Sequence, residues 1–260
     1  MMHMKNLHGT DQRTMAFINL YGVLGTLEEL CALDSHAKDI LGEKRIAVGF
    51  QVSGGPSATL TFDHGACTFS EGVERCDIKL PFSTPEKFNG MIDGTVTPFP
   101  SKGLTKVRFL TKEFIALTDQ LTKYLRASEA DLSDPAFFQT STTLMFYTIA
   151  SAISQIGNED RIGQASASYI PDGVIQLSIK GGPTAMIKAK NHRLKTIKQP
   201  GTQAVSARME FGSMEIARDL FEGRRNSLAC IGTGEICLGG RVPMLDNMNR
   251  ILDRVALYLA

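Results

Sequence analysis

The sequence predicts an α+β protein built from two copies of one domain. Three observations predict it: a weak internal repeat, short alternating strands after a helix in each half, and an amphipathic helix closing each half. Alternating apolar residues are typical of half-buried strands, and apolar residues spaced by three or four are typical of helices. Each copy is therefore expected to be a mixed β-sheet covered by helices, with a C-terminal amphipathic helix.

The repeat has a period near half of the 260-residue chain. Gly54-Gly55-Pro56 recurs as Gly181-Gly182-Pro183 after 127 residues, and Asp63-His64 recurs as Asn191-His192 after 128 residues. Matches in the same order at a nearly constant shift indicate a tandem duplication. We place the first domain at 1–130 and the second at 131–260, with a short polar linker between them.

The same order of helices and strands is predicted in each half. The opening helix is expected over 12–40, broken near Gly25, and its counterpart over 135–156. Alternation predicts strands at 46–52, 58–62, 76–80 and 107–109 in the first half, and at 174–179, 185–189, 205–211 and 236–238 in the second. A capping box from Ser83 to Glu86 and an N-cap at Ser213 predict short helices that end at Gly94 and Gly223.

Composition limits the partners that this chain is expected to have. Its 28 basic and 27 acidic residues lack the basic excess of a nucleic-acid-binding protein. The most apolar stretch, 144–156, is too short and too polar to span a bilayer. The opening Met1–Lys5 does not predict a secretion signal, and five cysteines suit reduced thiols. We therefore expect a cytoplasmic protein with at most transient membrane-surface contact; the sequence leaves open whether it forms a homo-oligomer.

The segments 76–96 and 205–225 carry a resemblance. Each has an alternating strand, a capped short helix and a terminal glycine. With the preceding hairpins and the final amphipathic helices, they resemble the sterol carrier protein family (the sterol-binding domain), present as two tandem copies. The resemblance implies a cavity between sheet and helices that binds lipids such as sterols, fatty acids or acyl-CoA without covalent chemistry.

The expected function is non-catalytic binding and carriage of a hydrophobic ligand. The residues expected to line the cavities are apolar and lie on the short helix, the adjoining strands and the final helix of each half. In the first copy they are Phe82, Phe88, Met91, Ile92, Phe109, Phe114, Leu117 and Leu121. In the second copy they are Phe211, Ile216, Leu220, Phe221, Ile236, Met244, Met248 and Leu252. We expect the better cavity in the second copy, whose final helix contains more methionine.

Two other functions remain open at this point. The chain could be an enzyme or enzyme accessory acting on apolar acyl-CoA or steroid intermediates. It could also have a structural or interaction role, with side chains filling both cavities, because apolar residues at helical spacing are usually core.

No motif of a hydrolase, zinc protease or nucleotide-binding loop is found, so no catalytic residue, metal or cofactor is predicted. His64 and His192 could form an acid–base pair, but predicted hairpin turns explain them better. Cys230 and Cys237 are expected to pack in the core. The segment 232–234 is a fragment of a dinucleotide loop, and a strand bend is the better interpretation.

One cluster of positive charge flanks the second predicted hairpin. It consists of Lys188, Lys190, Arg193, Lys195 and Lys198. Such a cluster could contact anionic lipid headgroups or CoA phosphates. A solvated hairpin face is the interpretation that we favour, because lysine also discourages strand pairing at a sheet edge.

Overall fold

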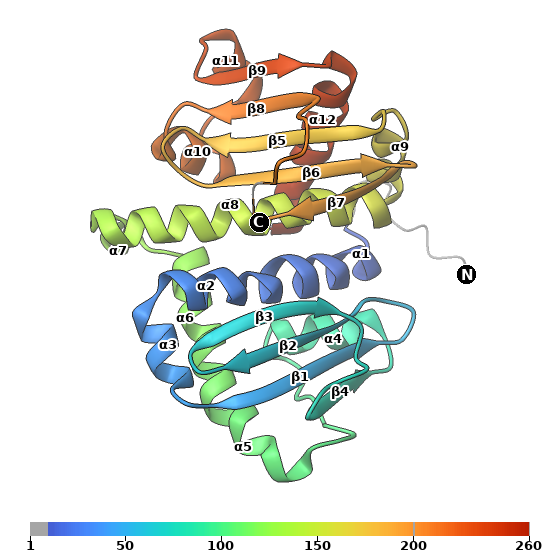
Figure 1. Cartoon of the computed structure of the whole chain (residues 1–260), viewed down its shortest axis with the longest axis vertical. Helices are drawn as coiled ribbons and strands as arrows, with labels where there is room; N and C mark the ends of the chain where they lie inside the picture. The colour runs from blue at the N-terminus through green and yellow to red at the C-terminus, as the bar shows by residue number, and fades with distance from the viewer. Residues whose placement is uncertain (1–9, 200, 260) are drawn as a thin grey trace.

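The computed structural model describes residues 10–199 and 201–259. Two β-sheets, one from each half of the chain, lie on either side of helices that run between them (Figure 1). The segment Met1–Lys5, on which the expectation about a secretion signal rests, lies outside the described residues.

The chain opens with one helical stretch that changes its geometry along its length. It comprises α1 (Gln12–Phe17), a π-helical segment (Ile18–Val23), a 3-10 turn (Leu24–Thr26) and α2 (Leu27–Leu33). The predicted break near Gly25 is therefore wrong. The break falls at Asp34, whose side chain accepts a hydrogen bond from the backbone of His36 and caps α3 (Ser35–Leu41). Gly22 instead permits close packing, because a Cβ there would lie 3.4 Å from the carbonyl oxygen of Thr148.

The first sheet has the strand order β3-β2-β1-β4. Its strands are β1 (Arg45–Val52), β2 (Ser57–Asp63), β3 (Ala66–Glu71) and β4 (Ile78–Phe82). Strand β1 pairs antiparallel to β2 and parallel to β4, so the sheet is mixed as predicted. Strand β3 was not predicted, because only Cys67 of this edge strand is buried and its alternation of apolar and polar residues is therefore weak.

Helices from the rest of the first half cover this sheet. They are α4 (Pro85–Ile92), η3 (Leu104–Lys106), α5 (Val107–Phe109), η4 (Leu110–Phe114) and α6 (Ile115–Leu125). The strand predicted at 107–109 is wrong, because Phe109 belongs to the buried face of a helix that continues into α6. The capping box is also misplaced by one residue. Thr84, not Ser83, is the N-cap and accepts a hydrogen bond from the backbone of Lys87.

The two halves are joined by a short helix, α7 (Glu129–Leu132), and by the long helix α8 (Pro135–Glu159). Asp134 caps α8 directly before Pro135, where the sequence predicts that a helix begins. Helix α8 lies between the two halves (Figure 1). Leu144 of α8 packs in the core of the first half, whereas Ile18 of the opening stretch packs in the core of the second. Each half therefore contributes a side chain to the core of the other.

The second half has a five-stranded sheet with the order β7-β6-β5-β8-β9. Its strands are β5 (Gly173–Ile179), β6 (Thr184–Lys190), β7 (Arg193–Ile197), β8 (Ala207–Phe211) and β9 (Ile236–Gly240). Its helices, after α8, are α9 (Arg161–Ser168), α10 (Met214–Phe221), α11 (Ser227–Gly232) and α12 (Val242–Leu259). The predicted strand bend at 232–234 is wrong, because Gly232 ends α11 and Thr233 is its C-cap.

The second sheet repeats the pairing pattern of the first. Strand β5 is antiparallel to β6 and parallel to β8, as β1 is to β2 and β4. Strand β9 extends the second sheet, whereas the corresponding edge of the first carries an isolated bridge between Lys79 and Lys102. The edge strand β7 was missed by the sequence analysis, because it buries only Leu194.

One helical stretch, Gln12–Leu33, is long and apolar enough to cross a membrane by length and composition alone. This is not the stretch 144–156 that the sequence analysis considered. In the structure, 61% of its most apolar 18-residue stretch is buried, and a core helix of a soluble protein can have the same length and composition.

Candidate ligand-binding cavity

A cavity of about 500 Å³ lies mainly in the second half, between β8, β9 and the helices α8, α10 and α12, and the end of α6 in the first half also lines it. Its lining is mostly apolar, with polar side chains from α10 and the segment that follows it, from α12 and from the segment after α6. The lining residues are Leu125, Arg126, Ala127, Met145, Ile149, Met209, Phe211, Arg218, Leu220, Phe221, Glu222, Gly223, Arg225, Asn226, Ser227, Ile236, Asn249, Leu252, Asp253, Val255, Ala256 and Leu259.

Helix α10 forms one wall, and local sequence signals fix its two ends. Ser213 accepts a hydrogen bond from the backbone of Ile216 and begins the helix. Gly223 has a φ of 70°, which glycine adopts without strain, and turns the chain away after Glu222. Leu220 and Phe221 in the last turn consequently face the cavity.

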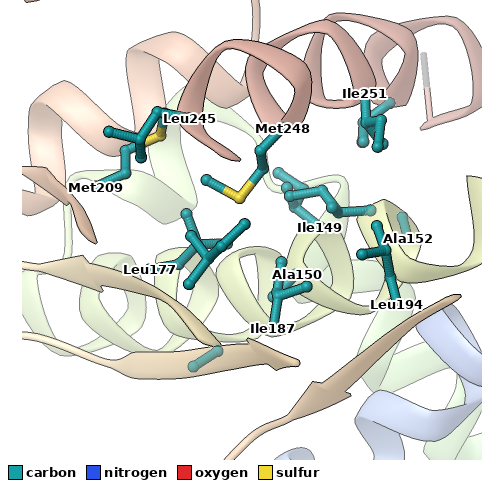
Figure 2. Packing of buried hydrophobic residues seen from close by; sticks show 14 of the residues in the cluster. Ile149, Ala150, Ala152, Leu177, Ile187, Leu194, Met209, Leu245, Met248 and Ile251 are labelled. Carbon is teal, nitrogen blue, oxygen red and sulfur yellow. The ribbon is translucent and has the colours of Figure 1, made fainter. Parts of the chain in front are cut away.

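Five of the eight residues predicted for the second copy line this cavity: Phe211, Leu220, Phe221, Ile236 and Leu252. Ile216 is half-buried outside the lining. Met244 and Met248 are fully buried in the core. Figure 2 shows Met248 of α12 packed over Leu177 and Ile149, so this methionine contributes to core packing and not to the cavity wall.

The residues predicted for the first copy lie together in one hydrophobic core. Six of them are less than 10% exposed: Phe82, Phe88, Phe109, Phe114, Leu117 and Leu121. Met91 and Ile92 are half-buried and pack against the same cluster. Ring centroids lie 5.2 Å apart for Phe82 and Phe88, and 6.3 Å apart for Phe50 and Phe88. Aromatic side chains therefore pack against one another where the first cavity was expected.

The two halves differ in side-chain size at equivalent positions. The parallel registers pair Val52 with Phe82 in the first half and Ile179 with Phe211 in the second. Two residues earlier, Phe50 of β1 corresponds to Leu177 of β5. Counting from the helix N-caps, Phe88 of α4 corresponds to Ala217 of α10. At two of these four positions, a phenylalanine of the first half is replaced by a smaller residue, Leu177 or Ala217, in the second.

Arg218 is the most buried charged side chain of the cavity wall, at 1% exposure. Its Nε donates a hydrogen bond to Oε1 of Glu222 over 2.5 Å, and its Nη1 donates to Oγ of Ser141 over 2.6 Å. The Ser141 hydroxyl in turn donates to the carbonyl oxygen of Tyr124 at the end of α6. Burial, with a smaller effect from nearby Arg224, lowers the pKa of Arg218 to about 10, so the guanidinium stays charged at neutral pH.

Two further polar side chains line the cavity from α12. Oδ1 of Asn249 is buried and has no hydrogen-bond partner among the described residues. Asp253 follows one turn later, and burial raises the pKa of its carboxyl group. Sequence reasoning missed these residues and Arg218. The helical period places Arg218 away from Ile216 and Leu220, so the apolar pattern contained no signal for it.

The other candidate residues lie outside the cavity lining. His64 and His192 are exposed in hairpin turns, as expected, with φ values of 48° and 61°. Cys230 is buried, but the prediction for Cys237 is wrong: this residue is exposed, because it lies on the edge strand β9. Within 10–199 and 201–259, no cluster of three metal-ligating side chains is found.

The basic cluster is divided by the structure. Lys188 and Lys190 on β6 lie opposite Lys195 and Arg193 on β7, and all four side chains are exposed. Lys198 instead forms an ion pair with Glu29 of α2 at 2.5 Å. Four of the five cations therefore stay exposed on the hairpin, where Arg193 also pairs with Glu159 and Lys195 with Glu71.

No family model and no curated protein matches the chain. Among solved structures, it is similar to a ubiquinone synthesis protein, UbiJ-SCP2, at 14% identity, covering 42% of this chain and 91% of that one with a TM-score of 0.33. It is also similar to sterol carrier protein domain 2 of Helicoverpa armigera, at 15% identity, 43% and 88% coverage, and a TM-score of 0.36. Sterol carrier protein 2 of Yarrowia lipolytica matches at 19% identity, 41% and 88% coverage, and 0.32. Because these TM-scores lie below 0.5, we argue function from the cavity and not from these matches.

Proposed function

We propose that this protein binds and carries a hydrophobic ligand in the cavity of its second half. The observation that carries the proposal is a mostly apolar cavity of about 500 Å³ bounded by a sheet and three helices. Pockets for small organic ligands typically have volumes of about 300–1,000 Å³ and a few polar groups that orient the ligand. Transfer of an acyl chain or ring system into the cavity would gain about 0.8 kcal/mol per CH₂ group removed from water.

The proposal includes two sterol-carrier-like domains in tandem. The shared pairing of β1, β2 and β4 with that of β5, β6 and β8 supports it. In this arrangement the second domain binds the ligand, while the first, with its aromatic core, supports the shared helix α8. We propose that this carrier leaves its ligand chemically unchanged, because apolar side chains form most of the cavity wall. We also propose that it is cytoplasmic.

A tryptophan substitution tests the proposal, because the chain contains no tryptophan of its own. Leu252 lines the cavity from α12, and Leu257 of the same helix is 51% exposed outside it. Leu252→Trp would fill part of the cavity, whereas Leu257→Trp adds the same ring on the surface. We expect the wild type and Leu257→Trp to take up a fluorescent fatty acid, and Leu252→Trp to bind it at least about tenfold more weakly. Equal binding by all three proteins would contradict the proposal.

A further inference from the structure

We propose that Arg218 makes the cavity selective for an amphiphile with a negatively charged head group, against neutral lipids of the same length. This inference rests on the proposed function and adds the chemistry of the ligand's polar end. Three observations carry it: the unused donors of a buried guanidinium, the charges that surround it, and the residue at the equivalent position in the first half.

The guanidinium of Arg218 has five N–H donors, and the protein uses only part of them. Nε donates to Glu222 and Nη1 donates to Ser141, so these two hydrogen bonds engage two of the five N–H groups. Arg218 lines the cavity and is 1% exposed, so bulk water reaches it poorly. A ligand oxygen in the cavity could accept hydrogen bonds from the remaining N–H groups.

A charged acceptor suits this position better than a neutral one. Hydrogen bonds in which the donor or the acceptor is ionised are about twice as strong as neutral ones, and an anionic acceptor adds a Coulomb attraction to the guanidinium that a hydroxyl group lacks. Burial has removed hydration from the guanidinium, and the lowered pKa of Arg218 reflects that cost. A carboxylate or phosphate oxygen restores the lost stabilisation, whereas a hydroxyl group restores less of it.

The carboxylates near Arg218 are mostly paired with arginine. Glu222 forms ion pairs with both Arg218 and Arg224. Asp219 and Glu235 pair with Arg225, which also lines the cavity.

Two further charged groups line the cavity without an ion-pair partner among the described residues. Arg126 adds a positive charge, and Asp253 adds a negative one. Burial raises the pKa of Asp253, and in its ionised form this carboxylate opposes an anion.

The equivalent position in the first half has a different residue with different bonding. Asn89 lies five residues after the N-cap of α4, as Arg218 does after the N-cap of α10. The Nδ2 of Asn89 donates to the side chain of Gln12, and its Oδ1 accepts from Asn19. The buried polar group of the first half is neutral and bonded to the opening helix. The second half has a cation with unused donors beside a cavity.

The test compares hexadecanoate with hexadecan-1-ol, which have the same chain length and differ in head-group charge. Each competes against a neutral fluorescent probe bound to the full chain at pH 8, with both ligands below their solubility limits. We expect hexadecanoate to bind at least tenfold more tightly to the wild type. In Arg218→Gln the preference should fall below threefold through loss of acid affinity, and Arg218→Lys should keep part of it. Arg250→Gln, an exposed position of α12 outside the lining, is the matched control and should keep the full preference.

The outcomes distinguish failure of the head-group selectivity from failure of the proposed function. Equal affinity of the wild type for the acid and the alcohol would overturn this inference and leave the proposed function standing. Failure of both ligands to bind would overturn the proposed function. An undiminished preference in folded Arg218→Gln would also overturn the assignment. The wild-type comparison decides the matter even where Arg218→Gln does not fold.

Discussion

Ala217 occupies in α10 the position that Phe88 occupies in α4, four residues after the N-cap of the helix. Both residues are fully buried. The ring of Phe88 packs against Phe50 and Phe82, whereas Ala217 has no ring to place between its helix and the sheet. The two halves share a pairing pattern and differ in how completely side chains fill their interiors.

Replacement of Phe88 by alanine tests whether the first half is a close-packed core. We expect Phe88→Ala to lower the free energy of unfolding by about 3–5 kcal/mol, because it removes a fully buried ring from an aromatic cluster. Urea unfolding followed by circular dichroism measures the loss. Ser83→Ala, at an exposed position before α4, should change it by less than about 0.5 kcal/mol. A loss below about 1 kcal/mol for Phe88→Ala would mean that this ring borders open space.

Asp253→Asn tests the electrostatics of the cavity. Asp253 lines the cavity and has no ion-pair partner among the described residues, so its negative charge opposes an anionic head group. Its removal should strengthen hexadecanoate binding about two- to threefold, as expected for a partly screened charge. Hexadecan-1-ol binding should not change. The competition assay described above measures both affinities, and an equal gain for the two ligands would contradict the electrostatic explanation.

The buried pair of Asp160 and Arg254 predicts a pH-dependent contribution to stability. Burial by itself would raise the pKa of Asp160, but hydrogen bonds from Arg254, the backbone of Gly163 and Tyr258 outweigh it and hold the pKa below its usual value. A carboxyl group with a lowered pKa in the folded state stabilises the protein above its unfolded pKa of about 3.9. That contribution is lost as the pH falls through the folded pKa.

Asp160→Asn should therefore lower the free energy of unfolding by about 3 kcal/mol at pH 7, since it leaves Arg254 without its carboxylate. The difference from the wild type should begin to narrow below about pH 4 and continue to narrow as the pH falls through the lowered folded pKa, where the wild-type carboxyl group also becomes neutral. Urea unfolding between pH 3 and 7 follows this. Asp246→Asn removes an exposed ion pair with Arg250 and should cost less than about 1 kcal/mol. A pH-independent difference for Asp160→Asn would refute this explanation.

Local signals in the sequence were enough for much of the fold. Ser213 and Gly223 bound α10 as predicted, and Asp134 begins α8, because caps and left-handed glycines depend on a few neighbouring residues. The edge strands β3 and β7 were missed because each buries only one residue fully. The segment at Phe109 was misread because three alternating residues fit a helix as well as a strand.

The site was less predictable, because an apolar pattern does not distinguish a core from a cavity. Phe88 and Leu220 both lie on an apolar helix face, yet Phe88 is core and Leu220 lines the cavity. The difference depends on side-chain volumes that meet from distant segments. Arg218 likewise meets Ser141 from 77 positions away, a contact that no local pattern reveals.

The number of ligands bound per chain tests the central claim most directly. Native mass spectrometry of the full chain after incubation with excess hexadecanoate would count them. One cavity in the second half and a filled aromatic core in the first predict a single bound ligand per chain, even at high ligand excess. Two bound ligands would contradict the filled first half, and none would contradict the proposed function.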